Sequence, residues 1–408
     1  MTLADGMAPE VRRLLVGRGL RAFVDGYVAV LLPAYLLALG YGTWQVGLLS
    51  TATLLGSALA TLALGAWGHR ASSRFLLLGA ALLMTATGLG FAALSTFWPL
   101  LLVAFVGTMN PSSGDVSVFL PLEHARLAHA ADGDARTRLF ARYSLAGTFC
   151  AALGALSAGL PDALALIGVD RLLALRGMFV AYGAAGALIL VLYAGIREQP
   201  AQAEPTAPAP LGPSRGVVVR LAMLFSVDSF AGGLIVNSLL ALWLFERFGL
   251  SLTGAGAFFF WAGLFSAFSQ LAAPRVARRI GLLNTMVFTH IPASLFLILA
   301  AIAPNLGWAL GFLLLRAALS QMDVPARSAY VMSVVTPAER TAAASFTAVP
   351  RSLAAALSPS LGGALFAAGW MAAPLVACGC LKIAYDLALW QSFRRYPGDR
   401  VVSKLDRN

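Results

Sequence analysis

The sequence predicts an all-α membrane protein of twelve transmembrane helices, arranged as two pseudo-symmetric six-helix bundles. Three observations predict this fold class. The chain of 408 residues is 59% hydrophobic and only 12% charged, whereas a soluble domain is nearer half apolar and a quarter charged. The apolar residues form runs close to the roughly 20 residues that a spanning helix needs. Basic residues gather in alternate gaps between these runs.

The apolar runs define the expected helices in order. We expect them at 14–38, 43–67, 75–95, 97–120, 140–161, 174–196, 218–243, 252–273, 283–303, 306–332, 343–368 and 371–393. Only short gaps separate the third run from the fourth, at Ser95 and Thr96, and the eleventh from the twelfth, at Gly369 and Trp370, so these pairs must be antiparallel neighbours. The stretch 111–114, Pro-Ser-Ser-Gly, should loosen the fourth helix, because proline removes a backbone donor.

The distribution of arginine predicts the orientation of the chain. The N-terminal segment and every second loop are rich in arginine, while the opposite loops hold only Arg171, Arg176 and Arg247. Loops with excess positive charge stay in the cytoplasm. We therefore expect a multi-pass protein of the cell inner membrane with both termini cytoplasmic. The same rule accounts for the net charge of +11, so no nucleic-acid partner is expected.

A polar segment rich in proline and alanine divides the helices into two sets of six. The expected domains are 1–196, a cytoplasmic linker at 197–217, and 218–408. Short motifs recur at matching places in the two halves. They are VDGY at 24–27 with VDSF at 227–230, GDV at 114–116 with MDV at 322–324, and RYSLA at 142–146 with PRSLA at 350–354. Such parallel repeats are typical of membrane transporters.

With these features the chain resembles the major facilitator superfamily. The family's motif between helices 2 and 3, Gly-x-x-x-Asp-Arg-x-Gly-Arg-Arg, is degraded here to GAWGHRASSR at 65–74, which keeps Gly65, Arg70 and Arg74. The second copy, at 273–281, keeps Arg279 and Gly281. The proline-glycine motif of drug/proton antiporters is missing from helix 5. The resemblance implies alternating access around a central site lined by helices 1, 4, 7 and 10.

Four aspartates fall on these cavity-lining helices, where a charge in hydrocarbon costs at least ~2.5–3.5 kcal/mol. Asp25 in helix 1 and Asp228 in helix 7 lie near mid-membrane and are our candidates for proton coupling. The alternative for Asp25 is an intrahelical pair with Arg21, four residues earlier. The alternative for Asp228 is a structural hydrogen bond to another helix.

The other two aspartates lie in the cytoplasmic third of the membrane. We expect one ion pair in each half, Asp115 with Arg142 and Asp323 with Arg351, and these four residues are the predicted gate.

Arg21 and Arg316 are the candidates to bind an anionic group on the substrate, since arginine binds carboxylate or phosphate well. The alternative for Arg316 is a permanent pair with Asp323 or Asp228. Lys382 and Asp386 have i,i+4 spacing and are expected to pair with each other. His290 lies on a helix that is peripheral in the family. It is expected to be a buried, hydrogen-bonded histidine.

The predicted function is proton-coupled secondary transport of a small organic solute, with export as the favoured direction. Uptake of an organic anion or sugar is the alternative, and a non-transporting membrane receptor is the second. No nucleotide-binding loop, metalloprotease motif or nucleophile motif occurs. We therefore expect no enzymatic activity, no catalytic residue, no cofactor and no metal. The expected partners are the solute, protons and membrane lipid, and the expected oligomeric state is a monomer.

Overall fold

The computed structural model describes residues 9–110, 112, 117–130, 133–198, 211–336 and 339–394. All regular secondary structure in these residues is helical. Nine of the helices there are long and apolar enough to cross a membrane. The chain is thus an all-α membrane protein, as predicted, and the nine spans are consistent with the expected twelve.

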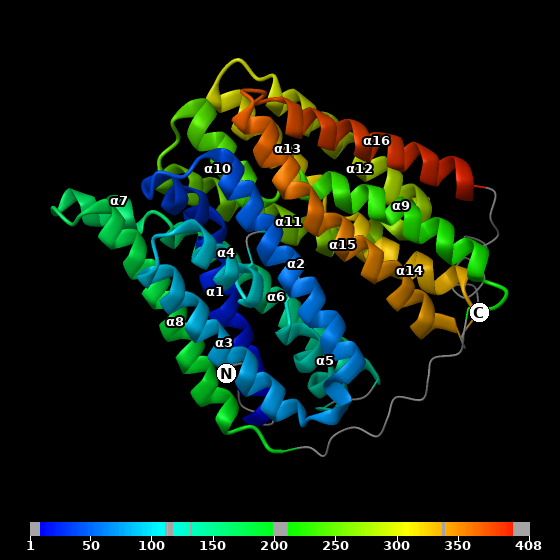
Figure 1. Cartoon of the computed structure of the whole chain (residues 1–408). Helices are drawn as coiled ribbons and strands as arrows, with labels where there is room; N and C mark the ends of the chain where they lie inside the picture. Colours follow the sequence, from blue (N-terminus) through cyan, green and yellow to red (C-terminus); the bar gives the residue numbers. More distant parts are fainter. Residues whose placement is uncertain are drawn as a thin grey trace, which may run out of the picture. The chain divides into compact units, whose positions relative to one another are not determined.

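The helices follow the apolar runs in order (Figure 1). The first set is α1 (Pro9–Ala38), α2 (Thr43–Trp67), the 3₁₀ turn η1 (Gly68–Arg70), α3 (Ser73–Ala93), α4 (Phe97–Val106), α5 (Phe119–Ala130), α6 (Gly133–Ser157), α7 (Leu160–Leu166) and α8 (Arg171–Ala194). The second set is α9 (Arg215–Gly233), α10 (Asn237–Phe248), α11 (Leu252–Ile280), α12 (Leu282–Ala301), α13 (Leu306–Leu319), α14 (Asp323–Val334), α15 (Arg340–Ala367) and α16 (Ala373–Phe393).

Three expected helices are each interrupted near their middle. In the run 97–120, α4 ends at Val106 and α5 begins only at Phe119 and continues to Ala130, beyond the expected end. The run 218–243 gives α9 and α10, and the run 306–332 gives α13 and α14. These are the fourth, seventh and tenth helices. Interrupted helices in transporters expose backbone groups where they line a cavity.

The chain forms two compact units. Unit 1 comprises residues 1–205 together with 237–260, and unit 2 comprises 206–236 together with 261–408. Helix α10 and the first turns of α11 therefore belong to unit 1. The division of the chain at a linker into domains 1–196 and 218–408 stays a prediction.

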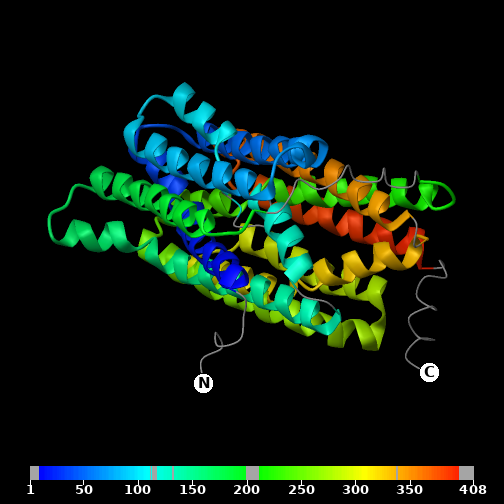
Figure 2. The same cartoon turned by 90° about the horizontal axis from the view of Figure 1, so that it is seen from below.

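Close helix pairs build unit 1. A Cβ atom on Gly154 of α6 would lie 1.8 Å from the carbonyl oxygen of Phe23 in α1, and one on Gly26 would lie 2.1 Å from that of Ala151. Helices α3 and α8 meet in the same way at Gly88 and Gly183, and they run side by side in Figure 2. Small residues at these crossings let the backbones touch, which is how membrane helices gain packing energy.

Unit 2 repeats this pairing with its own helices. A Cβ on Gly233 of α9 would lie 2.4 Å from the carbonyl oxygen of Ala355 in α15. Gly379 of α16 meets Ile298 and Ser294 of α12 equally closely, and α12 and α16 lie side by side in Figure 1. The first helix of each half thus packs on the fifth, and the third on the sixth. This correspondence is the pseudo-symmetry expected from the repeated motifs.

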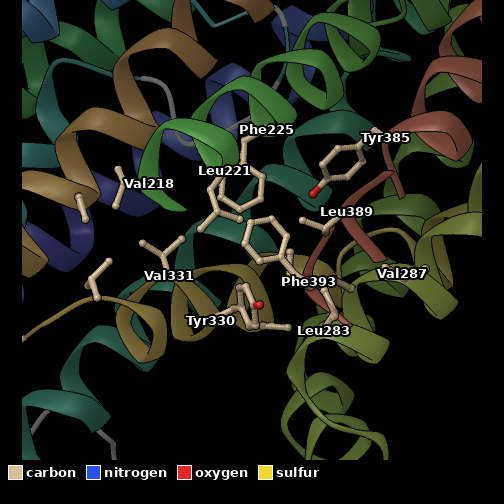
Figure 3. Packing of buried hydrophobic residues seen from close by; sticks show 14 residues of the cluster. Val218, Leu221, Phe225, Leu283, Val287, Tyr330, Val331, Tyr385, Leu389 and Phe393 are labelled. Carbon is tan, nitrogen blue, oxygen red and sulfur yellow. The ribbon is translucent and has the colours of Figure 1, made fainter. Parts of the chain in front are cut away.

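An apolar cluster lies within unit 2, among side chains of α9, α12, α14 and α16 (Figure 3). Phe225 of α9, Tyr330 of α14 and Tyr385 and Phe393 of α16 bring their rings together there, and each is at most 3% exposed. The rings pack edge to face, with centroids 6.4 Å apart for Phe225 and Tyr385 and 6.0 Å for Tyr330 and Phe393. The cluster joins the helices that carry the charges described below.

Glu339 fastens the end of the polar segment before α9 to unit 2. Its carboxylate accepts hydrogen bonds from the hydroxyls of Ser214 and Thr336, each at 2.6 Å, and from the backbone N–H groups of Gly212 and Ser214. These donors stabilise the charged form and lower the pKa of Glu339 from 4.5 to about 2.

This contact makes a pH-dependent contribution to the stability of unit 2. A carboxylate with a lowered folded-state pKa stabilises fully above its unfolded value, and that stability is lost as pH falls from about 4.5 toward 2. We expect Glu339→Gln to lower the melting temperature of the detergent-solubilised protein at pH 7 and to flatten its fall between pH 4.5 and 3. Parallel melting curves for wild type and variant across that range would contradict the assignment.

Candidate functional site

Two buried clusters of charged and polar side chains occur among the described helices, one in each unit. The cluster of unit 1 consists of Arg21, Glu123, Tyr143 and Tyr193, and we call it the arginine–glutamate cluster. The network of unit 2 consists of Asp228, His290, Asp323, Arg327, Lys382 and Asp386, and we call it the aspartate network. Buried charges of this kind must be paired, because the surroundings cannot solvate them.

The arginine–glutamate cluster is fully enclosed. Arg21 of α1 donates two hydrogen bonds to Glu123 of α5, at 2.7 and 2.8 Å, in the bidentate geometry that suits a carboxylate. Tyr143 of α6 and Tyr193 of α8 donate their hydroxyls to the same carboxylate. Arg21 is 1% exposed and Glu123 0%. One carboxylate thus ties four helices of unit 1 together.

Arg21 and Asp25, the two predicted site residues of α1, have different surroundings in the structure. Both terminal nitrogens of Arg21 are engaged by Glu123, so the intrahelical pair with Asp25 is not what holds the guanidinium. Asp25 is buried, at 8% exposed, one residue before the close approach of Gly26 to α6. It lies near Tyr182 of α8 and the backbone of Asn110. Its predicted role in coupling stays a prediction.

Glu123 is a partner that the hydropathy pattern alone missed. Hydropathy falls after residue 120, so the apolar run was ended there. The buried residues of α5 nevertheless recur at helical spacing, at Phe119, Glu123, Arg126 and Leu127. Continuing that periodicity past the apolar run would have found the carboxylate. Arg126 is a second buried residue of α5 that connects helices, because its side chain binds Glu10 at the start of α1 and Ser73 at the start of α3.

Asp228 is the centre of the aspartate network. Its Oδ1 lies 2.6 Å from Nζ of Lys382 on α16, and its Oδ2 lies 3.0 Å from Nη2 of Arg327 on α14. Asp228 is 4% exposed. The sequence showed no basic residue within its own helix turn, and both partners come from other helices of unit 2. The expected pairing of Lys382 with Asp386 is therefore wrong.

His290 lies between the carboxylate of Asp386 on α16 and that of Asp228 on α9. Its Nδ1 lies 3.1 and 3.0 Å from the two carboxylate oxygens of Asp386, which is 0% exposed. Its Nε2 lies 3.8 Å from Oδ1 of Asp228 and 3.5 Å from Nζ of Lys382. The histidine is buried and hydrogen-bonded, as expected. It nevertheless belongs to the same network as Asp228, although the resemblance to the family implied that its helix is peripheral.

The structure does not show the predicted ion pairs of the gate among the residues that it describes. Asp323 begins α14 and forms an ion pair with Arg327, four residues later, rather than with Arg351. Arg351 is half-buried on α15. In the first half, Arg142 is exposed on α6, while Asp115 lies outside the described residues. The gating role of these four residues stays a prediction.

Arg316 differs from the other arginines of unit 2. It lies on α13 near Cys378. Its side chain makes no hydrogen bond or ion pair with any residue that the structure describes. The alternatives that paired it permanently with Asp323 or Asp228 are therefore not seen, because Arg327 holds both of those carboxylates. A cation without such a partner suits an anionic ligand.

The two groups offer different chemistry. The arginine–glutamate cluster has one carboxylate, one guanidinium and two hydroxyl donors, and both carboxylate oxygens of Glu123 accept hydrogen bonds. The aspartate network has three carboxylates against Arg327 and Lys382, with His290 able to carry a further charge. Among the described residues, no group of three acidic, histidine or cysteine ligands is arranged to hold a metal ion. Proton exchange is the chemistry that such a network can support.

Solved structures of transporters share this fold. The nucleoside transporter NupG has a TM-score of 0.74 with 15% identity, and the match covers 95% of this chain and 99% of that chain. The D-xylose–proton symporter has a TM-score of 0.73 with 17% identity, over 93% and 97% of the two chains. The human organic anion transporter MFSD10 has a TM-score of 0.65 with 17% identity, over 93% and 99%.

Sequence comparison reaches one characterised family and one uncharacterised relative. An uncharacterised membrane protein of the yeast Saccharomyces cerevisiae is 26% identical over 341 residues, which cover 74% of this chain and 76% of the yeast protein. The model of the Major Facilitator Superfamily matches residues 14–322. That span and the helix pairing described above agree with the resemblance of the sequence. The chain belongs to the major facilitator superfamily of membrane transporters.

Proposed function

We propose that this transporter couples the movement of a small organic solute to protons by alternating access, in the direction of export from the cytoplasm. Asp228 carries the proposal. It is a buried carboxylate whose two oxygens each hold a cation from a different helix. A proton taken up at or beside such a carboxylate would release one of its partners, and a released cation can change the packing of helices. Asp25 is the proposed second coupling residue, in unit 1.

Arg316 is the proposed contact for an anionic group on the solute. A carboxylate or phosphate would supply the partner that the described protein does not. Arg21 would contribute only after Glu123 releases it, because both of its terminal nitrogens are engaged. Asp115, Arg142, Asp323 and Arg351 remain the proposed gate. The proposed setting is a monomer in the cell inner membrane with both termini in the cytoplasm.

Transport in proteoliposomes tests this function. A thermal-shift screen of purified protein against metabolites and drugs first identifies a solute. We then expect counterflow of that solute, and accumulation against its gradient when a pH gradient of the exporting sign is imposed. Accumulation only under the opposite arrangement would establish uptake instead. Counterflow without any response to the pH gradient would remove proton coupling, and no flux at all would favour a receptor.

A further inference from the structure

We propose that Lys382 and His290 compete for one oxygen of Asp228, so that a proton bound by His290 displaces the ammonium group of Lys382. His290 and Asp386 thereby form the proton-loading site of unit 2, and Lys382 is the group that responds. The inference deepens the proposed proton coupling and rests on it for its role in transport. The competition itself is a property of the network and can be tested separately.

The competition follows from which atoms face each other. Nζ of Lys382 lies 2.6 Å from Oδ1 of Asp228, and Nε2 of His290 lies 3.8 Å from that same oxygen. The second oxygen, Oδ2, is already held by Arg327 at 3.0 Å. Asp228 therefore offers a single oxygen to two groups whose nitrogens are only 3.5 Å apart. Both cannot be cations there, because like charges at that distance repel strongly in a poorly solvated site.

The neighbours of His290 fix its neutral form. A lysine ammonium donates hydrogen bonds and cannot accept one, so the Nε2 that faces it carries no proton. Nδ1 faces both oxygens of Asp386 and therefore carries the proton and donates it. This arrangement orients the ring and leaves the lone pair of Nε2 directed at Lys382 and Asp228.

The proposed step moves one proton and breaks no covalent bond. A proton from water binds the lone pair of Nε2, and the ring becomes a cation whose Nδ1–H still donates to Asp386. The new Nε2–H is then the donor nearest Oδ1 of Asp228. Lys382 keeps its own proton but loses its acceptor and moves away. Release of the proton from Nε2 on the other side of the membrane returns Lys382 to Asp228.

Among the residues that the structure describes, the other charged groups on the helices packed against α12 do not offer a competing acceptor. Asp323 of α14 is engaged by Arg327. Arg316, the charged residue of α13, lies near Cys378. Tyr385 of α16 places its ring edge to face with the imidazole, with the centroids 6.3 Å apart. His290 thus meets Asp386 on one side and the contested oxygen of Asp228 on the other.

Nuclear magnetic resonance of protein labelled with ¹⁵N-histidine tests the competition directly. The chain has four histidines, and His290→Gln assigns the relevant signal. We expect neutral His290 to carry its proton on Nδ1. In Lys382→Met the doubly protonated fraction at pH 7 should rise at least about threefold, because the repelling ammonium is gone. The matched change at the chain's other lysine, Lys404→Met, should leave the fraction unchanged.

Asp386→Asn provides a second variant if Lys382→Met does not fold. It removes the anion that supports the imidazolium, so the doubly protonated fraction should fall. A neutral form with the proton on Nε2, or a fraction unaffected by either variant, would overturn the proposal. Flux measurements answer a different question. If the resonance behaves as expected but a pH gradient does not drive transport, the proposed function fails while the competition at Asp228 stands.

Discussion

Asp228→Asn should abolish transport driven by a pH gradient and leave exchange of the same solute partly intact. The amide has nearly the shape of the carboxylate and still accepts a hydrogen bond, but it cannot change its charge. Exchange needs only the solute-loaded carrier to reorient, whereas driven transport also needs a network that takes up and releases a proton, and Asp228 supplies the negative charge at the centre of that network. Both fluxes are measured in the same proteoliposomes, so the ratio of driven flux to exchange is the informative quantity.

The variant also leaves two buried cations short of an anion, which can cost stability. Removing one partner of a buried ion pair typically costs about 3–5 kcal/mol. Arg327 retains Asp323, so we expect Lys382 to bear most of this cost. Asp170→Asn is a matched control, since Asp170 is exposed and caps α8, a position where asparagine serves equally well. Driven flux that survives in folded Asp228→Asn would remove Asp228 from the mechanism.

Arg21 and Glu123 should show the largest coupling in unit 1. We expect Arg21→Met and Glu123→Gln each to destabilise the protein by about 3–5 kcal/mol, because each leaves a buried charge unpaired. The double variant should cost much less than the sum, since no charge remains uncompensated. Melting temperatures in one detergent report all three changes. A double variant as damaging as the sum would show that the two residues are not partners.

Tyrosine variants give a graded check on the same cluster. Tyr193→Phe removes one hydroxyl donor to Glu123 and should cost about 1.5–3 kcal/mol, as expected for a hydrogen bond to a charged group. Tyr41→Phe is a useful comparison, because Tyr41 donates to the backbone of Ser95 in an exposed position. It should cost less. Equal effects from the two variants would argue against a special role for the buried carboxylate.

Hydropathy predicted where the helices lie far better than which side chains meet. The second helix was expected at 43–67, and α2 spans Thr43–Trp67. Apolar run length sets helix length in a membrane, so this part follows from local sequence. The interruptions at 233–237 and 319–323 were not predicted, because apolar residues continue through both. Hydropathy does not distinguish a straight helix from a broken one.

The ion pairs show why the site was only half predictable. A single sequence exposes i,i+4 neighbours, which predict a pair of Lys382 with Asp386 and, only as the alternative to proton coupling, a pair of Asp25 with Arg21. The structure instead joins Lys382 to Asp228 across 154 residues and Arg21 to Glu123 across 102. Such partners are chosen by helix packing, and the strong bidentate contact outweighs the intrahelical one. Charge in an apolar run predicted that a residue matters, and tertiary structure decided its partner.

The path of the chain has a consequence for cutting the protein in two. Residues 237–260 belong to unit 1 although they follow the linker. Ser238 bonds to Ser50, and Thr253 bonds to Asp162. If the chain were cut at the linker, the first fragment would lack α10 and the first turns of α11, which belong to unit 1. The second fragment would carry these residues instead. A break after Phe260 would instead cut α11 and leave α9, which belongs to unit 2, on the first fragment. A single cut therefore does not give two fragments that each contain one whole unit, and co-expressed halves split at the linker can complete both units only if residues 237–260 of the second fragment pack on the first.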